Sequence, residues 1–163
     1  MNSAKPLHQL IYCSRQTIRP EGLDGELEDI IQASVRNNQR AGVTGLLLAH
    51  QGWFLQVLEG TAVSVQTTYG RIINDSRHKD SHVISAAAVK DRVFGEWDMC
   101  ARRLRKEDDA ILKVLDLKGA FEPAKLSAAT SLRLLMAVRN IRGRVLPDAA
   151  RAGARHIVEV DQP

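Results

Sequence analysis

The sequence predicts an α+β fold of the ferredoxin-like type, in which the order β-α-β-β-α-β gives one mixed sheet with two helices on one face. Short apolar segments with strand-like composition alternate with two longer segments of helical periodicity. A glycine-containing turn joins two of the short segments as a hairpin. The length of 163 residues, with 44% of them apolar, suits one packed domain.

The first strand is expected over residues 7–14, which form a short apolar run. Asp24 is the predicted N-cap of a helix that continues to Asn38, because its side chain can accept hydrogen bonds from first-turn N–H groups. One face of this helix is apolar except for Ser34 and Asn38, which lie one turn apart. Polar groups that face a core need partners, so we mark this pair as candidate binding residues.

Two strands over residues 43–49 and 53–59 flank the predicted hairpin turn His50-Gln51-Gly52. Thr61 is the predicted cap of the second helix. The inner face of that helix is expected to contain four residues at helical spacing: Val65, Tyr69, Ile72 and Ile73. A fourth strand over residues 83–89 and a short fifth strand over residues 97–101 complete the predicted sheet.

After Leu104 the sequence predicts two helices, over residues 107–117 and 127–141. The second has an apolar stripe with Leu132, Leu135 and Val138. Neither helix is long enough to be stable alone, so both are expected to pack on the free face of the sheet. We therefore divide the chain into a sheet domain, residues 1–104, and a C-terminal helical extension, residues 105–163.

Charge and composition narrow the class of protein. Residues 102–163 contain 13 basic and 8 acidic side chains, but the two signs are interleaved and few aromatics accompany them, so nucleic-acid binding is not expected. No apolar run reaches the roughly 18 residues that a membrane span needs, and the N-terminus lacks a signal-peptide pattern. With only Cys13 and Cys100, no disulfide framework is indicated, and we expect a cytoplasmic protein.

Common catalytic motifs are absent from the sequence, which contains no G-x-x-x-x-G-K-[ST], G-x-G-x-x-G, H-E-x-x-H or G-x-S-x-G. Cys13 has no histidine near it in sequence, and we interpret it as a buried apolar cysteine. His78 stands between Arg77 and Lys79, a setting typical of a surface loop rather than of a metal site. We therefore expect neither an enzyme nor a metal protein.

Four polar residues instead interrupt apolar segments: Tyr12, Ser34, Asn38 and Gln56. Gln56 lies within Phe54-Leu55-Gln56-Val57-Leu58, where a buried amide must be hydrogen-bonded. Taken singly, each of the four can be a satisfied core polar group. Together they can surround a flat ligand rich in carbonyls and ring nitrogens, held between the two helices above the sheet.

Six sequence blocks then carry a resemblance to a known family. They are Leu10-Ile11-Tyr12-Cys13-Ser14, Arg36-Asn37-Asn38, Gly42-Val43-Thr44-Gly45-Leu46-Leu47, Phe54-Leu55-Gln56-Val57-Leu58-Glu59-Gly60, Arg77-His78 and Trp97-Asp98-Met99. In order and approximate spacing they are similar to BLUF domains, which are flavin-binding blue-light sensors. The resemblance covers about residues 6–104 and makes residues 1–104 the flavin domain. One departure is the loop at residues 15–23, about two residues longer than is usual in the family.

The resemblance implies the roles of individual residues. Tyr12 would be the electron donor, and Gln56 would be the amide between Tyr12 and the flavin ring. Trp97 and Met99 would couple the pocket to the surface. The residues that would bind the flavin, which would be FAD with FMN or riboflavin as alternatives, are Ser34, Asn37, Asn38, Gln56, Arg71, Asp75, Arg77 and His78.

The implied function is a blue-light photoreceptor that signals to a downstream protein partner and forms a homo-oligomer, with the C-terminal extension as its output. Two alternatives stay open. A flavin-dependent oxidoreductase would need a substrate pocket and a proton donor beside the flavin, for which the sequence offers no candidate. A light-insensitive ferredoxin-like interaction module is opposed by the intact Tyr12, Gln56 and Asn38.

Overall fold

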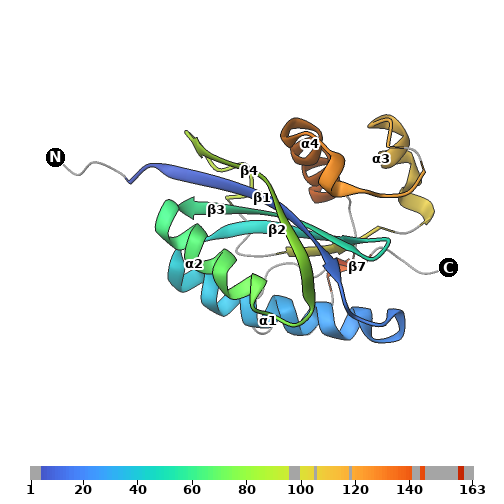
Figure 1. Cartoon of the computed structure of the whole chain (residues 1–163), viewed down its shortest axis with the longest axis horizontal. Helices are drawn as coiled ribbons and strands as arrows, with labels where there is room; N and C mark the ends of the chain where they lie inside the picture. The colour runs from blue at the N-terminus through green and yellow to red at the C-terminus, as the bar shows by residue number, and fades with distance from the viewer. Residues whose placement is uncertain are drawn as a thin grey trace.

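A five-stranded sheet with the order β4-β1-β3-β2-β5 forms the centre of the protein (Figure 1). The computed structural model describes residues 5–95, 100–104, 106–117, 119–140, 144–145 and 158–159. Neighbouring strands are antiparallel except for β2 and β5, which are parallel. The strands are β1 (Leu7–Gln16), β2 (Thr44–His50), β3 (Trp53–Thr61), β4 (His78–Val89) and β5 (Cys100–Arg103).

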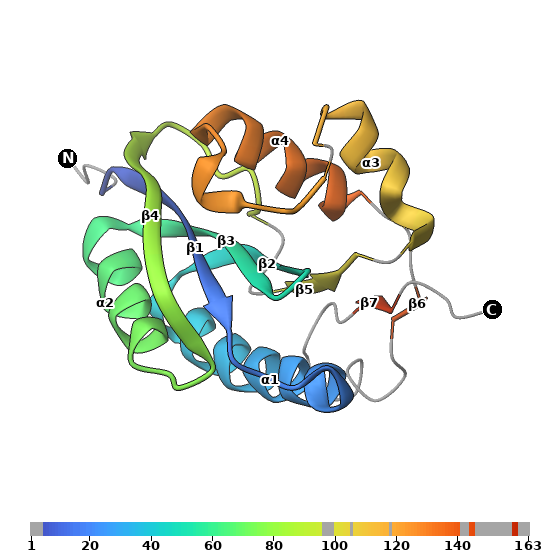
Figure 2. The same ribbon diagram turned by 45° about the vertical axis from the view of Figure 1, so that its right-hand side comes forward.

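Helices cover both faces of this sheet (Figures 1 and 2). On one face lie α1 (Leu23–Ala41) and α2 (Ala62–Ile73). On the other lie α3 (Asp109–Val114) and α4 (Ala128–Arg139). The predicted β-α-β-β-α-β order, with a fifth strand and C-terminal helices on the free face, is therefore confirmed.

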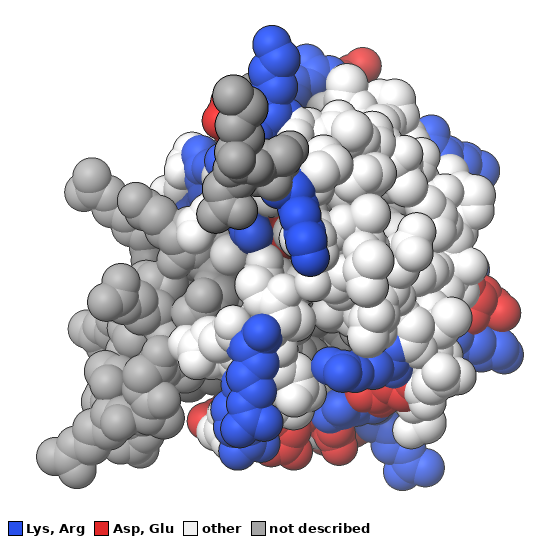
Figure 3. Space-filling model, turned by 90° about the vertical axis from the view of Figure 1, so that its left-hand side faces the viewer, with Lys and Arg blue, Asp and Glu red and all other residues white. Residues whose placement is uncertain are grey.

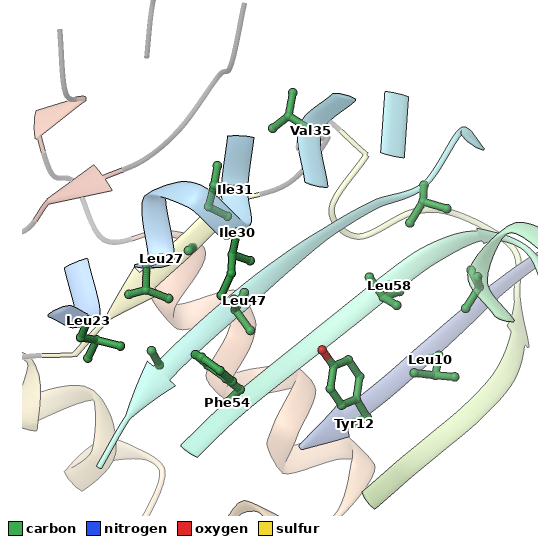
Figure 4. Packing of buried hydrophobic residues seen from close by; sticks show 14 residues of the cluster. Leu10, Tyr12, Leu23, Leu27, Ile30, Ile31, Val35, Leu47, Phe54 and Leu58 are labelled. Carbon is green, nitrogen blue, oxygen red and sulfur yellow. The ribbon is translucent and has the colours of Figure 1, made fainter. Parts of the chain in front are cut away.

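Alternate residues of each central strand enter different cores, which explains why these strands are apolar on both sides. Tyr12, Phe54 and Leu58 pack with α1 in the first core (Figure 4). Cys13 and Val57 point the other way and belong to the second core, which α4 completes. Cys13 is fully buried, as the sequence predicted.

The start of α1 differs from the prediction. A short 3₁₀ turn, Pro20–Gly22, runs directly into the helix, and Gly22 is the N-cap without a side-chain bond. The prediction that Asp24 is the cap is wrong: Asp24 lies in the first turn and pairs with Arg103 of β5 at 3.1 Å. At the other end, Gly42 adopts a left-handed conformation and donates its N–H to the last carbonyls of α1.

The boundaries of α2, β4 and β5 agree only in part with the prediction. Thr61 caps α2 as predicted, accepting from the N–H of Ser64 at 3.2 Å. Ile73, expected on the inner face, is 46% exposed because α2 ends there, and Thr68 is buried instead. β4 begins at His78, five residues earlier than expected, because β1 extends to Gln16 and pairs with it. The described part of the fifth strand is Cys100–Arg103, so most of the predicted range lies outside the described residues.

The C-terminal region contains less helix than predicted. A 3₁₀ turn (Lys106–Asp108) precedes α3, which is shorter than the expected range of 107–117. Ser127 caps α4 by accepting from Thr130 N–H at 3.1 Å. The buried face of α4 includes Leu135 and Val138, whereas Leu132 is only half-buried. A further 3₁₀ turn (Pro123–Lys125) precedes α4, and two short strands, β6 (Arg144–Val145) and β7 (Val158–Glu159), pair antiparallel.

The surface agrees with the sequence-based view of charge. On the face shown in Figure 3, basic side chains are scattered, several beside acidic ones, with largely uncharged surface between them. Within the described ranges, no helix combines the length and the apolar character needed to cross a membrane.

Candidate functional site

The centre of the site is a pair of buried polar side chains. Tyr12 on β1 and Gln56 on β3 lie directly opposite each other in the antiparallel ladder, and both are buried. The Tyr12 hydroxyl donates a hydrogen bond to Oε1 of Gln56. Burial raises the pKa of Tyr12 well above its ordinary value, and the nearby Tyr69 and Asp75 act in the same direction. The phenol is therefore protonated at neutral pH, with its proton directed at the amide.

Gln56 also forms part of the wall of a cavity between α1, the C-terminal half of α2 and the start of β4. The cavity has a volume of about 120 Å³ and is open to solvent on one side. Most of the binding residues named from the sequence meet here. The lining consists of Ile30, Ala33, Ser34, Asn37, Leu47, Gln56, Arg71, Ile72, Asp75, Arg77 and His78.

An ion-pair network forms one side of the cavity. Arg77 binds Asp75 with two nitrogens, Nε to Oδ1 at 2.9 Å and Nη2 to Oδ2 at 2.5 Å, and its Nη1 reaches Glu26 at 3.3 Å. These hydrogen bonds lower the pKa of Asp75, so the carboxylate is ionised. Arg71 also lines the cavity but is exposed, and its guanidinium makes no hydrogen bond in the described part of the chain. Arg71 is thus the arginine available to a ligand.

His78 forms part of the cavity wall. Its Nδ1 lies 2.9 Å from the Ser14 hydroxyl, and its ring centroid is 4.7 Å from that of Phe54. The pKa of His78 is lowered to about 4, chiefly by burial; the nearby Asp75 opposes this shift and Arg77 adds to it. The imidazole is therefore neutral at pH 7. The interpretation of His78 as a surface-loop residue is wrong, because pairing with β1 draws it into the first position of β4.

Four of the residues named from the sequence are not among those that line the cavity: Tyr12, Asn38, Trp97 and Met99. Tyr12 is joined to the lining by its hydrogen bond to Gln56. Asn38 is 2% exposed at the end of α1, and its backbone carbonyl accepts from Val43 N–H at 2.9 Å. A contact between the Asn38 side chain and a flavin stays a prediction. Trp97 and Met99 lie outside the described residues, so their predicted role also stays a prediction.

Sequence reasoning missed several contacts in and around the Tyr12–Gln56 pair. The other tyrosine of the chain, Tyr69 on α2, packs on Tyr12 with ring centroids 5.0 Å apart. Its hydroxyl is 2.7 Å from the Ser81 hydroxyl on β4. Helical spacing did place Tyr69 on the inner face of the second helix, but the ring contact depends on how α2 crosses the sheet. Nothing in the local sequence indicated that Ser14 would bond to His78 or that Glu26 would pair with Arg77.

A second cavity, of about 180 Å³, lies under the C-terminal region on the other side of the sheet. His50 from the β2–β3 hairpin and Phe121 form part of its wall, with their ring centroids 5.2 Å apart. Burial lowers the pKa of His50. None of the residues named from the sequence as site residues lines this cavity, so the first cavity is the candidate site.

The chemistry of the first cavity suits a flat, polar ring system. The Gln56 amide lies at its floor, and Asn37 and Arg71 add an amide and a guanidinium that can donate to carbonyl oxygens. Ile30 and Leu47 supply apolar surface for the faces of a ring. The ionised Asp75 offers acceptors for hydroxyl groups. These residues fit a flavin, which has carbonyls and ring nitrogens on one edge and a polyhydroxyl chain.

Comparison with known proteins gives a consistent result. Residues 7–100 match the family described as "BLUF: Sensors of blue-light using FAD". The photoactivated adenylate cyclase subunit alpha of Euglena gracilis is 34% identical over 94 residues, which are 57% of this chain and 9% of that protein. The blue light- and temperature-regulated antirepressor BluF of Escherichia coli (strain K12) is 31% identical over 112 residues, 68% of this chain and 27% of that protein.

A solved structure described as "BlrB - a BLUF protein, dark state structure" superposes with a TM-score of 0.68 at 26% identity. The match covers 83% of this chain and 96% of that one, so it extends beyond residues 7–100, which match the family. The chain spans only about a tenth of the length of the cyclase subunits that it matches. What those longer proteins do as a whole does not follow from the match.

Proposed function

The chain belongs to the BLUF family, the sensors of blue light using FAD, and from this premise we propose that Tyr12 and Gln56 are its photoactive pair and that the C-terminal helices carry its output. The observation that carries the proposal is the buried hydrogen bond from Tyr12 to Gln56 at the floor of the cavity. It joins a phenol, which can give up an electron and a proton, to an amide that can take the proton.

We assign the cavity between α1 and α2 to the flavin. Asn37 and Arg71 would hold the carbonyl edge of the ring, and Asp75 would accept from the hydroxyls of the ribityl chain. Arg77 already neutralises Asp75 and Glu26, so its part is to fix Asp75 rather than to bind phosphate directly. The family description names FAD. FMN and riboflavin are alternatives, because the cavity residues would bind the ring and the ribityl chain, which all three flavins share.

When bound, the flavin supplies the absorption of blue light and the oxidising power of its excited state. Tyr12 is the electron donor. Its phenol, protonated in the dark because burial raises its pKa, becomes a strong acid once it has lost an electron. The hydrogen bond already in place directs that proton to Oε1 of Gln56, so no side chain has to move first.

Gln56 converts the proton movement into a switch. An amide has an acceptor at one end and donors at the other, so rotation or tautomerisation exchanges which end faces Tyr12. The electron and the proton then return to Tyr12, and the new arrangement of hydrogen bonds remains. No product leaves the site, which makes the response reversible and the protein a sensor rather than an enzyme.

The test is the absorption spectrum of the purified, flavin-loaded protein in the dark and under blue light. We expect a reversible shift to longer wavelength without bleaching. Tyr12→Phe should keep the flavin, because the ring still packs, but should abolish the shift. Tyr69→Phe is the matched control, since it removes the other tyrosine hydroxyl and leaves Tyr12 in place. A full shift in Tyr12→Phe would remove Tyr12 from the mechanism.

We further propose that residues 105–163 act as the output that a protein partner reads, within a homo-oligomer in the cytoplasm. The named relatives support signalling to other protein parts: one is an antirepressor and another is a light-activated cyclase. The test compares partner capture in dark and light by the full chain and by a chain ending at residue 104. Flavin binding and the photoshift report whether the shortened chain is folded. Equal light-dependent capture by both would place the output on the flavin domain.

A flavin oxidoreductase is the second candidate, but the described cavity does not favour it. The side chain nearest to the role of proton donor is His78, which is neutral with a pKa of about 4. Bleaching of the flavin by a nicotinamide, with turnover, would support the oxidoreductase. A protein that purifies without flavin would support the light-insensitive module.

A further inference from the structure

A buried carboxylate lies on the opposite face of the sheet from the flavin cavity. Glu59, near the end of β3, is 0% exposed. Its carboxylate accepts three hydrogen bonds, from Gln9 Nε2 at 2.9 Å, Val93 N–H at 3.0 Å and Phe94 N–H at 2.9 Å. Burying a carboxylate is costly unless its oxygens are satisfied, so these bonds fix the position of every group that donates them.

The register of the sheet ties this carboxylate to the photoactive pair. Gln9 lies opposite Glu59 in the same β1–β3 ladder in which Tyr12 lies opposite Gln56, three residues away. Side chains three residues apart on a strand point to opposite faces. The two strands therefore carry the photoactive pair on the α1 face and the Gln9–Glu59 bond on the α4 face.

Glu59 holds the segment that follows β4. Besides the two N–H groups that Glu59 binds there, Arg92 reaches back to the sheet through three hydrogen bonds: to Thr44 Oγ1 at 2.8 Å, to the Glu59 carbonyl at 2.8 Å and to the Gly42 carbonyl at 2.7 Å. The Phe94 ring is fully buried in the second core. Residues 92–94 are thus anchored to the sheet in two ways. The N–H groups of Val93 and Phe94 bind Glu59, and the side chains of Arg92 and Phe94 pack or bond against the sheet.

The same segment also holds α4. Arg139, the last residue of that helix, donates from Nη1 to the Val93 carbonyl at 2.7 Å. Its guanidinium lies over the Phe94 ring, 5.6 Å from the centroid. The backbone of Val93 is therefore held from two sides. Its N–H donates to Glu59 of β3, and its carbonyl accepts from Arg139 of α4.

We propose that Glu59 and Arg139 are positioning residues that couple the Tyr12–Gln56 pair to α4 through residues 92–94, which we name the clamp segment. A rearranged amide at Gln56 changes the pairing of β1 with β3, and Glu59 must keep its three bonds or bear the cost of a buried, unsatisfied carboxylate. The clamp segment therefore moves with β3, and Arg139 passes the displacement to the end of α4. The inference rests on the proposed function.

The test uses the full, flavin-loaded chain and follows hydrogen exchange of the α4 amides in dark and light. In the wild type, light should change the exchange of the C-terminal half of α4. Arg139→Gln should reduce this light-dependent change by about fivefold or more, because the bond to the Val93 carbonyl is lost, and should leave the absorption shift intact. Arg133→Gln is the matched control: Arg133 lies on the same helix, is exposed, and among the described residues its side chain hydrogen-bonds only to Thr130, at 3.5 Å.

Glu59→Gln tests the other end of the clamp segment with nearly the same volume. One carboxylate oxygen becomes an NH₂ group, which accepts no hydrogen bond. Because Val93 N–H and Phe94 N–H bind different oxygens of Glu59, one of them loses its acceptor. The light-dependent change at α4 should again fall, with the absorption shift retained. A wild-type change at α4 in Arg139→Gln, or a normal absorption shift in the wild type with no change at α4, would overturn the inference. Absence of any absorption shift in the wild type would instead contradict the proposed function.

Discussion

Protonation of His78 should destabilise the protein between pH 7 and pH 4. The imidazole is buried against Phe54 and bonded to Ser14, and its pKa is about 4, whereas the ordinary value is 6.5. Between these two values the unfolded chain binds a proton that the folded chain does not. The contribution of the neutral His78 ring to the free energy of unfolding is thus fully present above about pH 6.5. This contribution decreases as the pH falls toward 4, and it does not change further below that pH.

The size of the effect follows from the two pKa values. A difference from 6.5 to about 4 corresponds to about 3 kcal/mol. Because the ring is not fully removed from water, solvent screening reduces this to about 2 kcal/mol. The suitable variant is His78→Gln, whose amide does not titrate and can still bond to the Ser14 hydroxyl.

The assay is urea unfolding of the flavin-free protein at pH 7, 6, 5 and 4, followed by circular dichroism. Other groups titrate in this range, including His50 and Asp75, so the quantity to compare is the difference in unfolding free energy between wild type and His78→Gln. Between pH 7 and pH 4 the free energy of unfolding of the wild type should fall by about 2 kcal/mol more than that of His78→Gln. Parallel pH profiles for the two proteins would refute the buried, neutral state of His78.

Three further outcomes are expected. Asn38→Ala should weaken flavin binding by about 1–3 kcal/mol, roughly tenfold to a hundredfold in the dissociation constant measured by fluorescence titration; unchanged binding would restrict Asn38 to ending α1. Gln56→Leu should keep the flavin but lose the absorption shift, and a full shift would remove the amide from the mechanism. Gly45→Ala should cost about 3 kcal/mol in urea unfolding, because its Cβ would lie 2.0 Å from the Val57 carbonyl oxygen, whereas Gly25→Ala, with open space around its Cβ, should not destabilise.

The sheet and the buried amide of Gln56 could be predicted because their signals are local. Strand composition, the hairpin turn and the capping Thr61 depend on residues close together in sequence. A polar residue within an apolar strand, such as Gln56, identifies itself because a buried amide needs a partner. The identity of that partner, Tyr12, came from the family resemblance and is confirmed by the β1–β3 register.

The remaining features depend on contacts between distant segments. Asp24 has a good capping side chain, but the 3₁₀ turn before it supplies the start of α1, and Arg103 from β5 takes its carboxylate. His78 looks like a charged loop residue in sequence, and only the length of β1 makes it the first residue of β4. The length of the loop before α1 does not predict where that helix begins. The charges of the residues that flank His78 do not predict that His78 begins β4.

Glu59 illustrates how one short sequence block can serve two purposes. In Phe54-Leu55-Gln56-Val57-Leu58-Glu59-Gly60 the alternation of a strand sends Gln56 to the flavin cavity and Glu59 to the face covered by α4. The block therefore contains the amide that we propose for the photochemistry and the carboxylate that anchors the clamp segment, on a single strand. Both bonds join β3 to the same neighbouring strand, and on the coupling proposed above a change in one would be transmitted along the ladder to the other.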